Sequence, residues 1–100
     1  MKAVIVEDEQ LAAQVLNKLI NEVSNDITIV ATLQSIEESV EWFSINPMPD
    51  LVFMDIHLAD GSSFSIFDEV NITCPIVFTT AYDEYALKAF QVNSIDYLLK

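Results

Sequence analysis

Four short apolar runs, each followed by a residue suited to phosphate or metal chemistry, constrain this chain more than any other feature. The runs cover residues 2–6, 51–54, 75–78 and 95–99. The residues that follow them include Glu7, Asp8, Asp55, Thr80 and Lys100. If the runs are parallel strands of one sheet, their carboxyl ends lie side by side, where open α/β sheets place their sites. Three carboxylates, a hydroxyl and an ammonium would then share one pocket.

Helical spacing separates the apolar runs, so strands and helices alternate along the chain. After the first run, Leu11, Val15 and Leu19 recur every four residues, which predicts one wide apolar helix face that ends near Val23. Residues 27–33 are rich in β-branched side chains and are predicted to form the second strand.

Local signals mark the other helices and loops. Ser35 is a good N-cap with Glu38 as its capping-box partner, and the helix that they begin must stop at residues 46–49, which hold two prolines. Residues 56–63 are predicted to be a loop, and Asp83 is predicted to cap a later helix.

This alternation predicts an α/β fold, in which helices cover both faces of a doubly wound, five-stranded parallel sheet with strand order 2-1-3-4-5. We expect one domain over residues 1–100, truncated after the fifth strand. The alternation calls for a further helix after Lys100. Without it, apolar surface near Leu98 is left bare, and we expect the segment to dimerise, exchange elements or be only marginally stable.

The composition excludes several classes of function. Four basic residues against sixteen acidic ones give a net charge of -12, which argues against nucleic-acid binding by this segment but suits Mg²⁺ and basic protein surfaces. Cys74 is the only cysteine, so no intrachain disulfide is possible. No apolar stretch approaches the ~20 residues of a membrane span. We expect a cytoplasmic protein that does not bind membranes.

The acidic residues at the strand ends suit one divalent cation. Like charges crowded in one pocket are unfavourable unless a cation compensates them, and Mg²⁺ prefers oxygen ligands. We expect Asp8 and Asp55 to bind Mg²⁺ directly. We expect Glu7 to act through a water molecule, and the backbone carbonyl of His57 to complete the set.

The same pocket suits phosphoryl transfer. A free carboxylate oxygen of Asp55 can attack an activated phosphoryl group, with Lys100 as a point charge on the phosphoryl oxygens and Thr80 as a neutral donor. Each residue alone has a structural explanation: Asp55 as a turn residue, for example, or Glu7 and Asp8 as complements to a helix dipole. Their coincidence at neighbouring strand ends favours a functional site.

These motifs resemble the receiver domain of two-component response regulators, which has a flavodoxin-like fold. Residues 4–9 match its acidic pair, 49–55 its phosphoacceptor strand, 78–81 its switch hydroxyl and 96–100 its switch aromatic and lysine. Residues 81–90 further resemble receivers of the LytTR (LytR/AlgR-like) class, which are coupled to DNA-binding domains.

The resemblance implies a regulatory switch rather than an enzyme. Asp55 would take a phosphoryl group from a sensor histidine kinase, and Thr80 and Lys100 would contact the phosphoryl oxygens. Tyr97 would swing inward as Thr80 moves, altering the face through which such receivers form homodimers. Autodephosphorylation would reset the switch. An output domain, absent from this chain, would bind DNA and control transcription.

Two departures and two rival functions bear on this interpretation. Glu7 replaces the commoner aspartate of the acidic pair, and residues 56–61 lack the usual proline. A metal-dependent phosphatase with an aspartyl nucleophile would need a second aspartate where His57 stands. The alternative that keeps the receiver fold is a protein-interaction module that no longer depends on phosphorylation.

Overall fold

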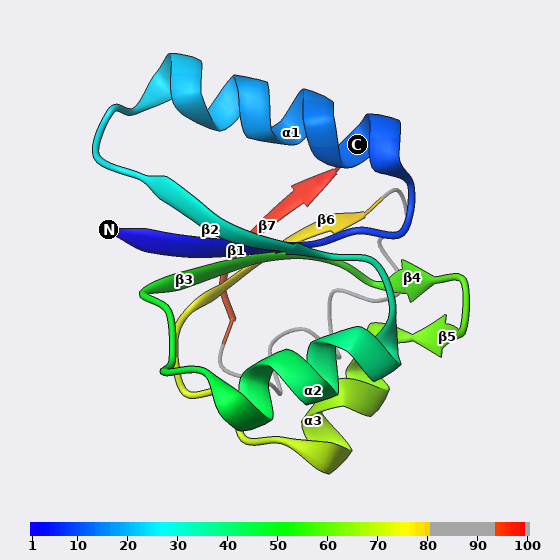
Figure 1. The fold of residues 1–100 in the computed structure, drawn as a ribbon. Coiled ribbons are helices and arrows are strands. Elements are labelled where there is room, and N and C mark those ends of the chain that lie inside the picture. The colour runs from blue at the N-terminus through cyan, green and yellow to red at the C-terminus, as the bar shows by residue number, and fades with distance from the viewer. Residues whose placement is uncertain (81–93, 100) are drawn as a thin grey trace.

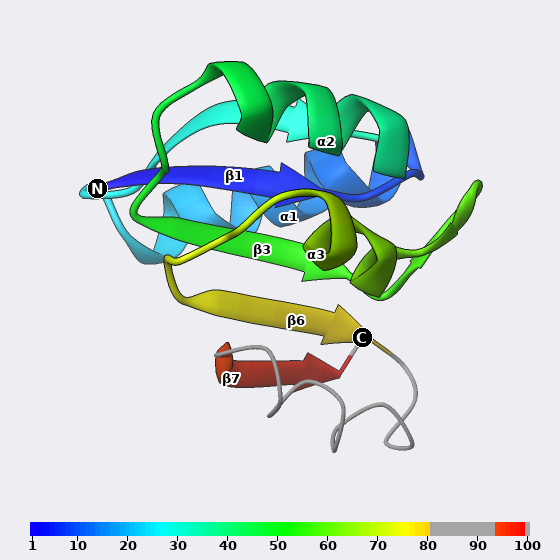
Figure 2. The ribbon, with the colours of Figure 1, turned by 90° about the horizontal axis from the view of Figure 1, so that it is seen from below.

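A computed structural model describes residues 1–80 and 94–99 of the chain. Its centre is a five-stranded sheet in which every pair of neighbouring strands is parallel. From one edge to the other the strands are β2 (Thr28–Leu33), β1 (Lys2–Val6), β3 (Leu51–Asp55), β6 (Ile76–Thr80) and β7 (Ser94–Leu99). Figure 2 shows the last four strands side by side. The predicted order 2-1-3-4-5 is confirmed.

Helices cover both faces of the sheet. In Figure 1, α1 (Gln10–Val23) lies on one face, and α2 (Ile36–Ile45) and the short α3 (Ile66–Glu69) lie on the other. A 3₁₀ turn, η1 (Ser63–Ser65), leads into α3. None of the helices in the described ranges is both long enough and apolar enough to cross a membrane.

The loop predicted after the third strand contains a small hairpin. Strand β4 (His57–Leu58) pairs antiparallel with β5 (Gly61–Ser62), in a register that sets His57 opposite Ser62. Gly61 has a backbone φ of +135°, a conformation that residues with a Cβ atom rarely adopt. The prediction of a loop over residues 56–63 was wrong at the four positions that form these strands.

The core is divided by the sheet into two clusters, because successive strand residues point to opposite faces. On the α2 and α3 side, the buried strand residues include Val4, Val6, Val52, Met54, Ile76 and Phe78. On the α1 side they are Ala3, Ile5, Leu51, Phe53 and Val77. Strands buried on both faces are typical of parallel sheets and explain the nearly continuous apolar runs.

The predicted apolar face of α1 is only partly correct. Ala13 and Ile20 are buried against the sheet, whereas Leu11 is 73% exposed and Val15 and Leu19 are each 51% exposed. At about 100° per residue, Leu11 and Val15 lie about 160° around the helix from Ala13. The apolar residues span more of the helix than one side of a sheet can cover.

The start of α2 follows the predicted capping pattern with one difference. The Ser35 hydroxyl accepts a hydrogen bond from the Glu38 amide at 3.0 Å, as an N-cap should. The Glu38 carboxylate accepts from the Gln34 amide at 3.2 Å, one residue before the position that a capping box uses.

Candidate metal centre at the strand ends

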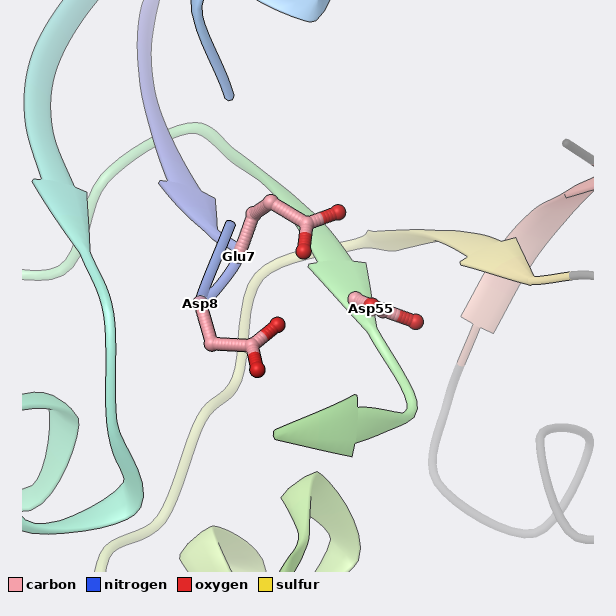
Figure 3. Close-up of side chains that lie close together, drawn as sticks. All are labelled: Glu7, Asp8 and Asp55. Atoms are coloured by element: carbon pink, nitrogen blue, oxygen red, sulfur yellow. The ribbon is translucent and has the colours of Figure 1, made fainter. Parts of the chain in front are cut away.

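Three carboxylates gather at the carboxyl ends of β1 and β3. Glu7 and Asp8 directly follow β1, and Asp55 is the last residue of β3. One carboxylate oxygen from each residue lies within 4.8 Å of those from the other two. Figure 3 shows the three side chains together at the ends of the two strands. The predicted convergence of Glu7, Asp8 and Asp55 is therefore present in the structure.

Strand register brings these residues together. Val6 pairs with Met54, so the residues that follow them leave the sheet at the same level. The Glu7 amide donates to the carbonyl of Leu33 at 2.9 Å, which extends the contact between β1 and β2 by one residue before the chain turns. Buried apolar residues upstream of both acids fix this register, because a one-residue slip would move each of them to the opposite face of the sheet and disrupt both packed clusters.

Local hydrogen bonds orient the carboxylates of Glu7 and Asp55. The Glu7 carboxylate accepts from the Glu9 amide at 3.2 Å, within the turn that leads into α1. The Asp55 carboxylate accepts from the His57 amide at 3.4 Å. Both bonds hold an acidic side chain against backbone that leaves the sheet.

The site concentrates negative charge where water has little access. Glu7 is 2% exposed and Asp55 is 8% exposed, while Asp8 is half-buried. At 4.8 Å, two unit negative charges repel by about 1 kcal/mol in a water-like medium and about 3.5 kcal/mol at an effective dielectric constant of 20. Three hard oxygen donors that repel one another in this way fit a hard divalent cation such as Mg²⁺.

The structure says less about the other residues that were predicted for the site. His57 opens β4 with its side chain exposed. Thr80 closes β6, where its backbone pairs with Leu99, and Tyr97 pairs with Phe78. Lys100 and the helix predicted to begin at Asp83 lie outside the described residues. The roles expected of Thr80, Tyr97 and Lys100 stay predictions.

One residue of the hairpin that follows β3 was not singled out from the sequence. Asp60, at the turn of the β4–β5 hairpin, accepts hydrogen bonds from the amides of Ile36 and Glu37 at the start of α2. The Asp60–Gly61 pair is a known turn signal. No local pattern shows that its carboxylate caps a helix 24 residues earlier in the chain.

The chain matches the family described as "Response regulator receiver domain" over residues 3–100. Because this match covers nearly the whole chain, the chain belongs to the receiver domain family of response regulators. The predicted family is confirmed, and with it a regulatory class of protein.

Individual relatives agree with this family. The chain is 45% identical to "Sensory transduction protein LytT" of Enterococcus faecalis, in an alignment that covers 100% of this chain and 42% of that protein. It is 34% identical to "Transcriptional regulatory protein LytR" of Staphylococcus aureus, in an alignment that covers 100% of this chain and 41% of the relative. The chain thus spans about two fifths of the length of these relatives.

Solved structures share the fold. The response regulatory domain of mrkE from Klebsiella pneumoniae superimposes with a TM-score of 0.86 at 34% identity, covering 100% of this chain and 83% of that one. A two-component response regulator from Clostridium difficile gives a TM-score of 0.80 at 30% identity, with coverage of 100% and 83%.

Proposed function

We propose that this receiver domain is a Mg²⁺-dependent phosphoacceptor that takes a phosphoryl group on Asp55 from the phosphohistidine of a sensor kinase. The observation that carries the proposal is the meeting of three carboxylates from two strand ends within 4.8 Å. Asp55 differs from the other two because it ends the central strand of the sheet and is held by the buried residues on both sides of it. A rigid strand end is a suitable platform for a nucleophile.

The acidic cluster supplies ligands for the cation. Asp8 and Asp55 would bind it directly, Glu7 would act through a water molecule, and the His57 carbonyl would complete the protein's ligands. When bound, Mg²⁺ neutralises charge that develops on the phosphoryl oxygens. Burial of Glu7 and Asp55 excludes bulk water, which strengthens each of these interactions.

The chemical step on Asp55 is a simple displacement. A carboxylate oxygen of Asp55 attacks the phosphorus atom, and an O–P bond forms as the P–N bond to the kinase histidine breaks. The histidine nitrogen leaves with the electron pair of that bond. Lys100 and Thr80 would contact the phosphoryl oxygens. The phosphorylated side chain then carries about 1.5 to 2 negative charges at neutral pH.

The response to phosphorylation would involve the strands on the far side of β3. Thr80, at the end of β6, would move toward the phosphoryl group, and Tyr97 on β7 would turn inward. Homodimerisation through the altered face would transmit the signal. Hydrolysis of the aspartyl phosphate by the domain itself would reset the switch.

The relatives suggest how the switch is used. Two fifths of each relative's length corresponds to this chain, and one relative is named as a transcriptional regulatory protein. We infer that the receiver regulates an output domain that binds DNA in the cytoplasm. The receiver, with a net charge of -12, would not contact the nucleic acid itself.

Labelling with a small phosphodonor tests the proposed acceptor. The protein is incubated with acetyl phosphate and Mg²⁺, reduced with borohydride, and mapped by mass spectrometry for homoserine, the product of a reduced aspartyl phosphate. We expect homoserine at position 55 only, and none after chelation of Mg²⁺.

Two matched variants complete this experiment. Asp55→Asn removes the nucleophile and should abolish labelling. Asp50→Asn makes the same substitution at the opposite end of β3 and should leave labelling intact. Undiminished labelling of Asp55→Asn contradicts the assignment, and a wild-type chain that stays unlabelled favours the phosphorylation-independent interaction module.

A further inference from the structure

The side chain of Asp60 links the β4–β5 hairpin, which follows the phosphoacceptor strand β3, to the start of α2. Asp60 lies at the turn between β4 and β5, and both of its carboxylate oxygens accept from the Ile36 amide at 3.0 Å. One of them also accepts from the Glu37 amide at 3.4 Å. These three contacts cross 23 or 24 residues of sequence and join two separate parts of the fold.

The start of α2 provides the donors for this contact. The first amides of a helix have no partner within the helix, and a negative charge is favourable beside them. Ser35 satisfies only the Glu38 amide. Asp60 accepts from the two amides before it, those of Ile36 and Glu37, so these two amides have this acceptor only when the hairpin is in place.

The residue after Asp60 brings the hairpin close to the same helix. A Cβ atom on Gly61 would lie 3.3 Å from the Cδ1 atom of Ile36. Ile36 in turn packs against the core cluster on this face of the sheet. The tip of the hairpin is therefore held by hydrogen bonds and by close packing at one point.

The base of the same hairpin is attached to the acceptor strand. The Ser63 amide donates to the Ile56 carbonyl at 2.7 Å, which closes the hairpin one residue after Asp55. The His57 amide donates to the Asp55 carboxylate at 3.4 Å. The path of the hairpin thus sets where the backbone of residue 57 lies beside the acidic cluster.

We propose that Asp60 is a positioning residue for the cation site, which it supports by anchoring the β4–β5 hairpin to the N-terminus of α2. The inference rests on the proposed function, because it takes the Asp55 cluster and the His57 carbonyl as the cation's ligands. Without the anchor, the hairpin tip is free to move, and the backbone at residue 57 is less well placed to bind the cation.

Energetic coupling between two sites is reciprocal. If the anchor strengthens Mg²⁺ binding, then Mg²⁺ must strengthen the anchor by the same factor. The amides of Ile36 and Glu37 report on the anchor directly, because they donate to Asp60. Their hydrogen exchange should slow when Mg²⁺ is bound.

Calorimetric titration of the chain with Mg²⁺ tests the proposal. We expect Asp60→Ala to weaken Mg²⁺ binding on the order of 10-fold, the effect typical of groups that orient metal ligands. Asp60→Asn keeps one acceptor oxygen and should recover most of the affinity. An Asp60→Ala variant that is folded and binds Mg²⁺ as tightly as wild type would overturn the inference.

A matched variant separates positioning from general stability. The Asp50 carboxylate accepts from the Lys2 amide at 2.7 Å, which is also a contact between distant segments. It lies at the other end of β3, about 16 Å from Asp55 at about 3.3 Å per strand residue. Asp50→Ala should lower the stability of the chain without changing its affinity for Mg²⁺. Equal losses of affinity in Asp50→Ala and Asp60→Ala would contradict a specific role for Asp60.

Two further outcomes keep the inference testable. If Asp60→Ala does not fold, exchange of the Ile36 and Glu37 amides in the wild-type chain decides the matter, and rates that Mg²⁺ leaves unchanged overturn the proposal. If the wild-type chain does not bind Mg²⁺ at all, the proposed function fails. A wild-type chain that binds Mg²⁺ independently of Asp60 refutes only the inference about Asp60.

Discussion

Replacing Asp8 by asparagine should stabilise the metal-free protein and remove its response to Mg²⁺. Asparagine keeps the shape of the side chain and one oxygen acceptor, but it removes one of three charges that meet within 4.8 Å. Asp8 is the half-buried member of the cluster, so the substitution perturbs the core least. Removing either buried member, Glu7 or Asp55, would also change the packing at a strand end.

The size of the effect follows from Coulomb's law. The substitution removes two repulsive pairs, Asp8 with Glu7 and Asp8 with Asp55. Because Asp8 is half-buried and reaches solvent, each pair is taken at the water-like value of about 1 kcal/mol. The free energy of unfolding without metal should therefore rise by about 2 kcal/mol, which raises the Tm of a domain of this size by roughly 10 °C. Saturating Mg²⁺ instead favours the wild-type chain over the variant. At about 100 times its Kd it stabilises the wild-type chain by about 2.7 kcal/mol, and the variant by much less.

Thermal unfolding followed by circular dichroism, with chelator or with Mg²⁺, measures both effects. Glu9→Gln is the control, because Glu9 is exposed beside the cluster and the substitution makes the same change in charge. It should show neither the gain without metal nor the loss of the Mg²⁺ response. If Asp8→Asn is less stable than wild type in chelator and is stabilised equally by Mg²⁺, the reasoning about charge crowding is wrong.

Three further predictions concern the core, the cysteine and the hairpin. Phe78 is fully buried and contacts the ring of Phe64. Phe78→Ala should therefore lower the free energy of unfolding, measured by urea titration, by about 3 to 5 kcal/mol. A loss below about 1 kcal/mol would contradict the core described. Burial raises the pKa of the Cys74 thiol and shields it from reagents. Iodoacetamide should therefore modify native protein far more slowly than unfolded protein. Equal rates of modification would show that the thiol is accessible. The hydrogen bond from the Ile36 amide holds the pKa of the Asp60 carboxyl below its usual value of 3.8. The stabilising contact between Asp60 and Ile36 is therefore complete above pH 3.8 and is lost as the pH falls through the lowered pKa. The stability difference between wild type and Asp60→Asn, measured by chemical denaturation, should therefore shrink as the medium is acidified below pH 3.8, and a constant difference would exclude this linkage.

Much of the sheet could be predicted because its signals are local. Each central strand is a short apolar run whose two faces are both buried, so the order of strands and helices follows directly from the chain. The acidic cluster followed from the same pattern. Once β1 and β3 are neighbouring parallel strands, Glu7 and Asp55 must leave the sheet at the same edge.

Contacts between distant segments could not be predicted in this way. The apolar spacing of α1 includes both buried Ile20 and largely exposed Leu11, and only the position of the helix on the sheet decides which is covered. The anchor from Asp60 to Ile36 depends on a hairpin and a helix that are 24 residues apart. A turn signal at Asp60 and Gly61 identifies the bend but not its partner.

Paramagnetic broadening by Mn²⁺ tests most directly whether the strand ends share one cation. Mn²⁺ takes oxygen ligands like those of Mg²⁺ and broadens amide resonances near the ion. A titration of labelled protein should first broaden residues 7, 8, 55 and 57 together, and excess Mg²⁺ should restore them. Broadening spread over the acidic surface, with residues 7 and 55 no more affected than exposed Asp26 or Glu41, would show that these carboxylates do not form a site.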